Sequence, residues 1–429
     1  MKTCQIHKLL RGIECELSKI ESDPNGLCLM HSRNQNKDKD AFQSLIKDKI
    51  RSNDYNFQGY FFPIIAFNEE TFYNANFSYT IFYNYVSFEK AIFNGRTIFT
   101  CSIWLDDVNF SGATFNGHTD FRFVTFSEKA DFSFTKYNKS ALFLMANFLG
   151  YSRFWFSSFI GNVEFEYVSF MGFANFRGLR IENKLSFSWI NYGLIPNEFE
   201  GDFSILEIHK QGTLAFEHLS LAKIRFQDTD LRVPQFYHVT WQNYWWRNAI
   251  DDEIKIHRRE IKKISNAIMQ TSYLADVSIN EPNIVESRME SFLLNYAHVE
   301  KLYRELKINY ERQEDYKNAG DFHYGEMEMH RRASRWGWFP LNWYFLYRFL
   351  SGYGERPSWA LGWLALFLFG LAGLVWSLGL EIGQTQQLAG FNDAFIYWGY
   401  ALHSRIYYML CFTPPMILLP VTGSMDTAC

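Results

Sequence analysis

The fold is decided by residues 75–132, which read ANFSYTIFYNYVSFEKAIFNGRTIFTCSIWLDDVNFSGATFNGHTDFRFVTFSEKADF. Phenylalanine recurs every eleven residues through this stretch and on to residue 187. The members of this series are Phe77, Phe88, Phe99, Phe110, Phe121, Phe132, Phe143, Phe154, Phe165, Phe176 and Phe187. A second, mostly aromatic series stands five residues behind the first: Phe82, Phe93, Trp104, Phe115, Phe126, Tyr137, Phe148, Phe159, Phe170 and Ile181. The spacing between successive large residues therefore alternates between 5 and 6.

This alternation excludes a single continuous helix or strand. On an α-helix, five residues rotate the side chain by about 500°, so the two series would not share one buried stripe. On a straight strand, positions five apart point to opposite faces, so no face would collect the aromatic residues. A chain that turns a corner between successive aromatic residues can point each of them at a common axis. The pattern therefore predicts a coiled solenoid with a stacked aromatic core.

Small or β-branched residues recur two positions before the aromatic residues. They are Ala75, Thr80, Val86, Ala91, Thr97, Ser102, Val108, Ala113, Thr119, Val124, Ala130, Thr135, Ala141 and Ala146. A small side chain beside a large one suits the narrow interior of a solenoid, because its corners leave little room. The outward positions carry mostly polar residues such as Asn, Ser, Gly and Asp.

These units resemble the pentapeptide-repeat family. The resemblance is carried by the segments Ala75-Asn76-Phe77, Ala113-Thr114-Phe115, Ala130-Asp131-Phe132 and Ala174-Asn175-Phe176. It implies a mainly β fold, a right-handed quadrilateral β-helix in which the small residue and the central Leu or Phe point inward. The extra residue in every second unit departs from a strict five-residue repeat. We expect it at alternate corners, which gives a coil of about 22 residues rather than about 20.

The solenoid is predicted to span residues 60–246. Residues 188–215 lose the register and are predicted to be an inserted loop. The register then returns in steps of five, at Phe216, Leu221, Phe226, Leu231, Phe236 and Trp241. Trp241, Trp245 and Trp246 are predicted to close the apolar end, because terminal coils of a solenoid need a cap.

Residues 1–55 form a polar segment that contains Cys4, Cys15, Cys28 and His31. Three thiolates and one imidazole would complete a tetrahedral structural zinc (Zn²⁺) site, and a segment this short would gain much of its stability from the metal. His7 competes with His31 as the nitrogen ligand. The alternative is that the cysteines are ordinary free thiols. Disulfides are less expected, because Lys2, Lys8 and Arg11 interrupt any secretory signal.

Charged and helical sequence follows the solenoid. Residues 247–290 are predicted to be a charged helical linker, with Asp251-Asp252-Glu253 as one of its charged runs. Residues 291–335 resemble one tetratricopeptide-like helical hairpin, with a turn near Gln313-Glu314-Asp315. One such hairpin cannot form a solenoid, so we expect it to pack on a neighbour or to mediate self-association. Its Glu326, Glu328 and His330 are predicted to form a solvated helix face.

A membrane helix is predicted at residues 357–381, because positions 359–380 contain 22 residues without a charge. The aromatic residues of 336–356 predict a segment that lies in the membrane interface. Arginine is abundant before the span and sparse after it, which predicts a cytoplasmic repeat domain at a bacterial inner membrane.

Residues 391–429 are apolar but interrupted by charges and by Pro414, Pro415 and Pro420. The order of parts resembles bacterial pentapeptide-repeat proteins whose C-terminal half is an ion-channel-like module. This chain lacks the Thr-x-Gly-Tyr-Gly filter of such a pore, and Gly352-Tyr353-Gly354 precedes the span. We therefore interpret 391–429 as a degenerate or truncated pore-like region or a second membrane segment.

No catalytic motif is present: the sequence has no Gly-rich phosphate loop, nucleophile elbow or His-Glu-x-x-His. The chain is therefore predicted not to be an enzyme. We expect a membrane-anchored scaffold that binds an unidentified protein partner and that can form homo-oligomers. The alternative is a subunit of a channel-like assembly. A DNA mimic that binds topoisomerase is less favoured, and no nucleic acid is expected, because residues 66–190 hold eleven acidic and ten basic residues.

Overall fold

A computed structural model describes residues 3–10, 15–21, 23–63, 65–189, 197–258, 295–334 and 342–377. The chain divides into two compact units, Met1–Phe339 and Pro340–Cys429. The predicted segment 391–429 lies outside the described residues, as do 259–294 of the predicted linker and hairpin and 378–381 of the predicted span.

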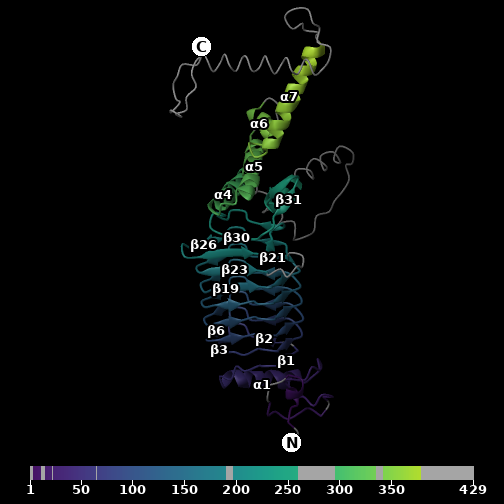
Figure 1. Ribbon diagram of the computed structural model, residues 1–429. Coiled ribbons are helices and arrows are strands. Elements are labelled where there is room, and N and C mark those ends of the chain that lie inside the picture. The colour runs from purple at the N-terminus through teal and green to yellow at the C-terminus, as the bar shows by residue number, and fades with distance from the viewer. Residues whose placement is uncertain are drawn as a thin grey trace, which may run out of the picture. The chain divides into compact units, whose positions relative to one another are not determined.

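The first unit is built on a β-solenoid of about eight turns (Figure 1). Four parallel sheets of very short strands form its sides, which confirms a four-sided coil. The handedness of the coil stays a prediction. The first sheet contains β1 (Phe61–Phe62), β4 (Ile81–Phe82), β8 (Ile103–Trp104), β12 (Thr125–Phe126), β16 (Asn147–Phe148) and β20 (Ser169–Phe170). The second contains β2 (Ile65–Ala66), β5 (Val86–Ser87), β9 (Val108–Asn109), β13 (Ala130–Asp131), β17 (Ser152–Arg153), β21 (Ala174–Asn175), β25 (Gly201–Asp202) and β29 (Ile224–Arg225).

The other two long sheets complete the coil. The third contains β3 (Thr71–Tyr73), β6 (Ile92–Asn94), β10 (Thr114–Phe115), β14 (Lys136–Tyr137), β18 (Ser158–Phe159), β22 (Arg180–Ile181) and β26 (Glu207–Ile208). The fourth contains β7 (Thr97–Ile98), β11 (Thr119–Asp120), β15 (Ala141–Leu142), β19 (Val163–Glu166), β23 (Lys184–Ser188), β27 (Thr213–Glu217) and β30 (Gln235–Tyr237). Two short pairs remain: β24 (Asn197–Glu198) with β28 (Leu219–Ser220), and β31 (Gln242–Tyr244) with β32 (Arg247–Ala249).

The coil length agrees with the 5 and 6 spacing. Thr114 pairs with Lys136 in the next coil, a step of 22 residues. Corners of the five-residue type place one residue in the left-handed region, as at Phe123 (φ 59°) and Phe134 (φ 57°). The described corners of the six-residue type from residue 105 to 173 have no positive φ, because the extra residue gives the chain enough length to turn without one. The extra residue therefore lies at alternate corners, as predicted.

The aromatic series form the core. Every Phe of the eleven-residue series is buried, and equivalent rings of successive coils stack face to face. Phe110 and Phe132, for example, have ring centroids 4.9 Å apart with an interplanar angle of 6°. Rings of neighbouring sides meet edge to face, as Phe110 and Phe121 do at 84°. Stacked and edge-to-face pairs each add about 0.5–1.5 kcal/mol beyond the burial of their area.

The predicted inserted loop at 188–215 is wrong for most of its length. β25 and β26 continue the second and third sheets within this range, and β24 pairs with β28. The coil is longer here, because Ala174 pairs with Gly201 and Leu185 with Leu214, steps of 27 and 29 residues. The extra residues hide the repeat in the sequence, while the second, third and fourth sheets continue across them and β24 pairs with β28 in a separate sheet.

The N-terminal module contains η1 (Ile6–Lys8) and α1 (Lys39–Arg51). Asp38 caps α1, because its side chain accepts a hydrogen bond from Ala41 N. Phe42 and Ile46 form the buried face of α1, and the Phe42 ring contacts Phe62 of β1 edge to face at 5.4 Å. The module therefore covers the first coil (Figure 1).

A helical hairpin closes the other end of the solenoid. It consists of α4 (Tyr296–Arg312) and α5 (Tyr316–Ala333), joined at the predicted turn. Trp241 is buried against Phe322, with ring centroids 5.4 Å apart, and Phe236 stacks on Tyr310. The prediction that Trp245 and Trp246 close this end is wrong, because they are 69% and 53% exposed.

Charged residues at this end are buried, contrary to two predictions. Residues 247–258 were expected to be linker, but β32 and the helix at 251–258 bury Arg247, Asp252 and Glu253. Glu326 and Glu328 are also buried, so only His330 of the predicted solvated face is exposed. The two buried glutamates of α5 have basic partners: Arg304 for Glu326 at 2.8 Å and Arg331 for Glu328 at 2.8 Å. Pairing on the hairpin surface, rather than solvent, compensates their charge.

The second unit contains α6 (Trp343–Ser351) and α7 (Pro357–Ser377). α6 ends at Gly352 in the left-handed conformation, and Pro357 occupies the first position of α7, where its missing N–H costs nothing. Within the described residues, α7 is the one helix long and apolar enough to cross a membrane, with a mean hydropathy of 1.6 over Pro357–Leu374. α6 lies inside the predicted interfacial segment, and it leaves Trp343, Phe349 and Leu350 exposed.

Candidate metal centre and outer surface

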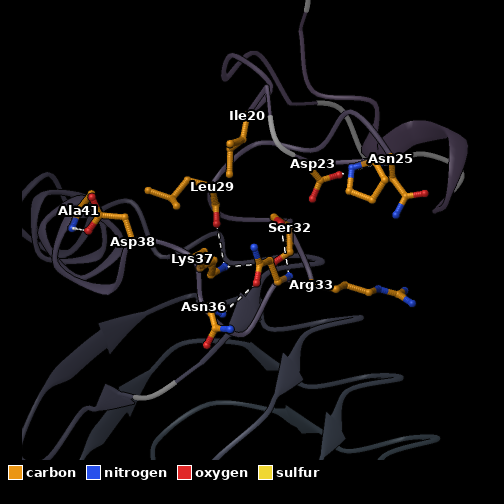
Figure 2. A pocket seen from close by; sticks show the side chains of 12 residues that line it. Ile20, Asp23, Asn25, Leu29, Ser32, Arg33, Asn36, Lys37, Asp38 and Ala41 are labelled. Carbon is orange, nitrogen blue, oxygen red and sulfur yellow. Dashed lines mark hydrogen bonds between the residues drawn. The ribbon is translucent and has the colours of Figure 1, made fainter.

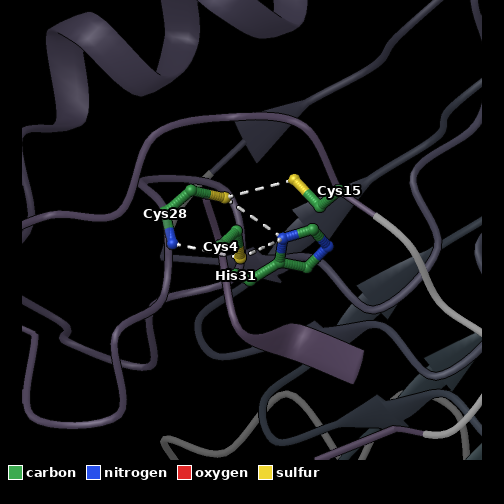
Figure 3. A group of neighbouring side chains, drawn as sticks. All are labelled: Cys4, Cys15, Cys28 and His31. Atoms are coloured by element: carbon green, nitrogen blue, oxygen red, sulfur yellow. Dashed lines mark hydrogen bonds between the residues drawn. The ribbon is translucent and has the colours of Figure 1, made fainter. Parts of the chain in front are cut away.

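The four predicted ligands come together in the N-terminal module (Figure 3). A tight turn, in which His31 N and Ser32 N both donate to Cys28 O, turns the side chains of Cys28 and His31 to one side. Backbone hydrogen bonds from Cys4 N to Leu17 O and from Gln5 N to Gly26 O bring the first segment alongside. The ligand atoms of Cys4, Cys15, Cys28 and His31 then lie within 4.8 Å of one another.

The distances suit tetrahedral coordination. With Zn–S bonds of about 2.3 Å, two sulfur ligands of one zinc ion lie about 3.8 Å apart. The Sγ atoms of Cys15 and Cys28 are 3.8 Å apart. His31 Nδ1 is 3.6 Å from Cys4 Sγ and 3.1 Å from Cys28 Sγ. The cluster is therefore compatible with a closed Cys3His structural site.

The surroundings of His31 select Nδ1 as the ligand atom. Its Nε2 lies 3.2 Å from the carbonyl oxygen of Gln58. An imidazole that donates from Nε2 keeps a free electron pair on Nδ1, which faces the sulfur atoms. The cluster thus contains His31; the side chain of the competing His7 lies outside the described residues.

One of the three thiols favours negative charge, whereas burial raises the pKa of Cys4. The hydrogen bond from Cys28 lowers the pKa of Cys15 to about 4, and the same contact together with burial raises that of Cys28. Cys28 N also lies 3.3 Å from Cys4 Sγ, in position to donate to it. Thiolates are the form that binds zinc, so Cys15 favours a metal ion as it stands, whereas Cys4 and Cys28 would release protons on binding one. No disulfide joins the described cysteines, and Cys101 is the only one of them outside the cluster.

Lys37, which sequence reasoning missed, lies next to the loop that carries Cys28 and His31, at the edge of a cavity of about 690 Å³ (Figure 2). Its Nζ is buried and donates to backbone carbonyl oxygens, among them Leu29 O at 2.7 Å. Burial lowers the pKa of Lys37 to about 7, whereas the carbonyl acceptors favour the ammonium form. Asp23 and Asp38 of the cavity wall accept backbone N–H groups of their own turns. These polar groups therefore maintain the local fold, and we assign the cavity no ligand.

An apolar stripe follows one corner of the solenoid. It consists of residues spaced 22 apart between the fourth and first sheets: Tyr79, Cys101, Phe123, Met145, Tyr167 and Trp189. Tyr79, Phe123 and Met145 are 42%, 46% and 45% exposed, and Tyr167 contacts Trp189 with ring centroids 5.9 Å apart. The first five members of the stripe are left-handed corner residues, whose side chains point away from the core, so the repeat geometry itself places them in line, whereas Trp189 also packs against the core.

The fold and its repeats agree with one comparison to known proteins. Residues 77–125 match the family model described as pentapeptide repeats (9 copies). This confirms the resemblance for that part of the chain and supports a pentapeptide-repeat β-solenoid. The comparison with curated proteins found no match.

Proposed function

We propose that this chain is a membrane-anchored pentapeptide-repeat scaffold that binds a protein partner at the cytoplasmic face of a bacterial inner membrane. The observation that carries the proposal is the apolar stripe from Tyr79 to Trp189. Contiguous exposed apolar surface of this kind is typical of a protein-binding site. Stacked coils present such a surface as one long face, which suits a protein partner better than a small ligand.

The stripe favours a helical partner. Coils of a solenoid repeat every ~4.8 Å, so the stripe offers one apolar side chain at each such step. An amphipathic helix presents one apolar side chain about every 5.3 Å along its axis, at alternating steps of three and four residues. A helix lying along the stripe would therefore stay nearly in register with it over several coils.

Site-specific photocrosslinking in intact cells tests this function. A photoreactive phenylalanine analogue would replace Phe123 or Met145, with Asn116 as the exposed polar control on another corner. We expect one crosslinked protein common to the two stripe positions and absent at Asn116. A crosslink between two copies of this chain would replace the proposed partner by a second copy. No crosslink, or equal crosslinking at Asn116, would contradict the stripe as a binding surface.

The proposed membrane anchor is α7. Its 21 residues extend about 32 Å at 1.5 Å per residue, enough for a hydrocarbon core of about 30 Å. Arg331, Arg332, Arg348 and Arg356 precede it, which favours a cytoplasmic first unit. Labelling of a cysteine introduced at exposed Lys136 by a membrane-impermeant maleimide tests the orientation: it should react only after cells are lysed.

The Cys/His cluster would hold a structural Zn²⁺ in this scaffold. The donor set of three sulfurs and one imidazole nitrogen is one that closed zinc sites use, and the 3.8 Å sulfur separation matches a tetrahedral edge. Its role would be to stabilise the N-terminal module, whose own apolar core is small. Elemental analysis of the purified full chain tests this: we expect about one zinc ion per chain.

A further inference from the structure

The buried ammonium group of Lys37 bridges two parts of the chain. Its Nζ lies 2.7 Å from Leu29 O and 3.3 Å from both Met30 O and Ser32 O, all in the loop that carries Cys28 and His31. It also lies 2.6 Å from Phe61 O, in the first strand of the solenoid. An ammonium group has three N–H donors, so these four acceptors use its full capacity.

Two further contacts join the same loop to the same coil. Phe61 N donates to Met30 O at 2.9 Å, next to the Lys37 contact. The imidazole of His31 donates from Nε2 to Gln58 O, so a metal ligand is itself attached to the first coil. The His31 ring also meets Tyr60 edge to face, with centroids 5.0 Å apart. These hydrogen bonds join the loop to the first coil along one continuous contact, which we call the seam.

The seam covers an edge that needs protection. β1 is the terminal strand of its sheet, and an open strand edge invites pairing with other chains. Phe57 and Phe62, at the bottom of the aromatic core, are fully buried beneath the module. If the loop moved away, the carbonyl of Phe61 and these rings would be exposed together.

The charge of the metal centre should affect the contacts that Lys37 makes with the loop. Zn²⁺ bound by three thiolates and a neutral imidazole has a net charge of −1, and Lys37 next to the loop supplies +1. Without metal, the loop that presents the three carbonyl oxygens would be held only by the backbone hydrogen bonds of its turn. Without Lys37, the loop keeps its ligands but loses its attachment to Phe61.

We propose that Lys37 is the positioning residue that couples the metal centre to the first coil, so that metal binding closes the N-terminal edge of the solenoid. This inference rests on the zinc site proposed above. Lys37→Met keeps the length and apolar stem of the side chain and removes the ammonium group. Lys47→Met, at an exposed position of α1, is the matched control.

Two measurements on the full chain in detergent test the coupling. The first is hydrogen exchange of the wild-type protein with zinc and after stripping by a chelator, which needs no variant. We expect amides of residues 57–62 to exchange at least about tenfold faster without zinc, with amides of 110–132 unchanged. Equal protection of 57–62 in the two states would overturn the proposal.

The second measurement is zinc affinity by chelator competition, with hydrogen exchange of the same variants. Lys37→Met should bind zinc about 10–100-fold more weakly than Lys47→Met and should expose residues 57–62 even when loaded with zinc. Affinity and edge protection equal to the control would overturn it. If the wild-type chain binds no zinc, the zinc proposal fails, and edge protection in Lys37→Met still decides whether Lys37 holds the coil.

Discussion

The two ends of the solenoid are closed by opposite chemistry. At the N-terminal end a cation, Lys37, donates to backbone carbonyl oxygens of the first coil and of the loop that carries Cys28 and His31. At the C-terminal end carboxylates accept backbone N–H groups: Asp252 from Phe226 at 3.0 Å and Glu305 from Leu231 at 3.0 Å. Terminal strands leave backbone groups unpaired, and burying them unpaired is costly. At each end, side chains of the cap make the hydrogen bonds that these backbone groups would otherwise lack.

The ends differ in what holds the cap itself. The helical hairpin brings its own aromatic core, in which Tyr310 and Phe322 pack on Trp241. The N-terminal module buries short stretches of apolar side chains, among them Leu27, Met30 and Phe42, and its segments meet at the Cys/His cluster. A cap with a small core gains stability from a crosslink, and the proposed metal ion would provide one. We therefore expect that loss of the Cys/His cluster destabilises only the N-terminal end, and that substitutions in the helical cap destabilise only the C-terminal end.

The largest effect is expected from loss of the metal site. Cys28→Ser should abolish zinc binding and unfold the module, because structural zinc in small domains contributes on the order of 10 kcal/mol. Cys101→Ser removes a cysteine outside the cluster and is the control. Elemental analysis should find zinc in the control only, while hydrogen exchange at Phe226 and Leu231 stays unchanged in both. Zinc retained by Cys28→Ser would refute the ligand set.

The next effect should appear at the helical end. Arg247 Nη2 lies 2.7 Å from both carboxylate oxygens of Glu253, the pair is buried, and Tyr303 donates to the same carboxylate. Arg247→Met leaves that charge unpaired and should cost about 3–5 kcal/mol in denaturant unfolding.

The control for this prediction is the double variant Arg247→Met with Glu253→Met. It removes both charges and should lose much less stability than the single variant. Equal losses would mean that the pair contributes through packing rather than charge. Zinc content should stay at the wild-type level in both variants, since the pair is at the opposite end.

The sequence predicted the regular part of the molecule well. The eleven-residue period alone identified the buried side chains from Phe77 to Phe187, because each coil repeats the same geometry. The prediction failed where the coil lengthens, as between Ala174 and Gly201. The extra residues there break the eleven-residue spacing in the sequence, although the strands on both sides of them still pair. The Cys/His cluster could be predicted because Cys and His are uncommon and lie close together in the sequence.

Buried charges at the two ends could not be predicted. Asp251-Asp252-Glu253 reads as a solvated run, yet the chain buries it because carboxylates satisfy terminal N–H groups. Lys37 looks like any lysine of a polar loop, and only the three-dimensional arrangement of carbonyl oxygens around Nζ shows its role. These groups depend on partners distant in sequence, such as Phe61 and Phe226, which no local pattern contains.

A smaller, pH-dependent effect should come from Asp252. Burial raises its pKa from 3.8 to about 7, and among the described residues Oδ1 has no hydrogen-bond partner. Asp251, Asp202 and Arg225 are the charged groups that face it. The folded state then binds the proton more tightly than the unfolded state. Stability from this group is complete below about pH 4 and is lost as pH rises through about 7.

Asp252→Asn tests whether Asp252 makes the folded state less stable as pH rises. The amide keeps an oxygen that accepts from Phe226 N and does not ionise. Denaturant unfolding between pH 4 and 8 should show the wild type losing up to a few kcal/mol relative to the variant, since one pKa unit corresponds to about 1.4 kcal/mol. Parallel pH profiles for the two proteins would show that Asp252 does not titrate in this range.

The smallest effect isolates one hydrogen bond within the aromatic cap. Trp241 Nε1 donates to the Tyr310 hydroxyl at 2.8 Å, and both side chains are buried. Tyr310→Phe keeps the ring but leaves the indole N–H without this acceptor, which should cost about 1 kcal/mol. Tyr316→Phe, at a side chain that is 72% exposed, should cost almost nothing. If the two variants are equally stable, this hydrogen bond contributes nothing to the hairpin cap, and packing of the Trp241, Tyr310 and Phe322 rings holds its core. The contrast with the N-terminal end would then be sharper, because the N-terminal module would depend on specific polar contacts such as those of Lys37 and His31.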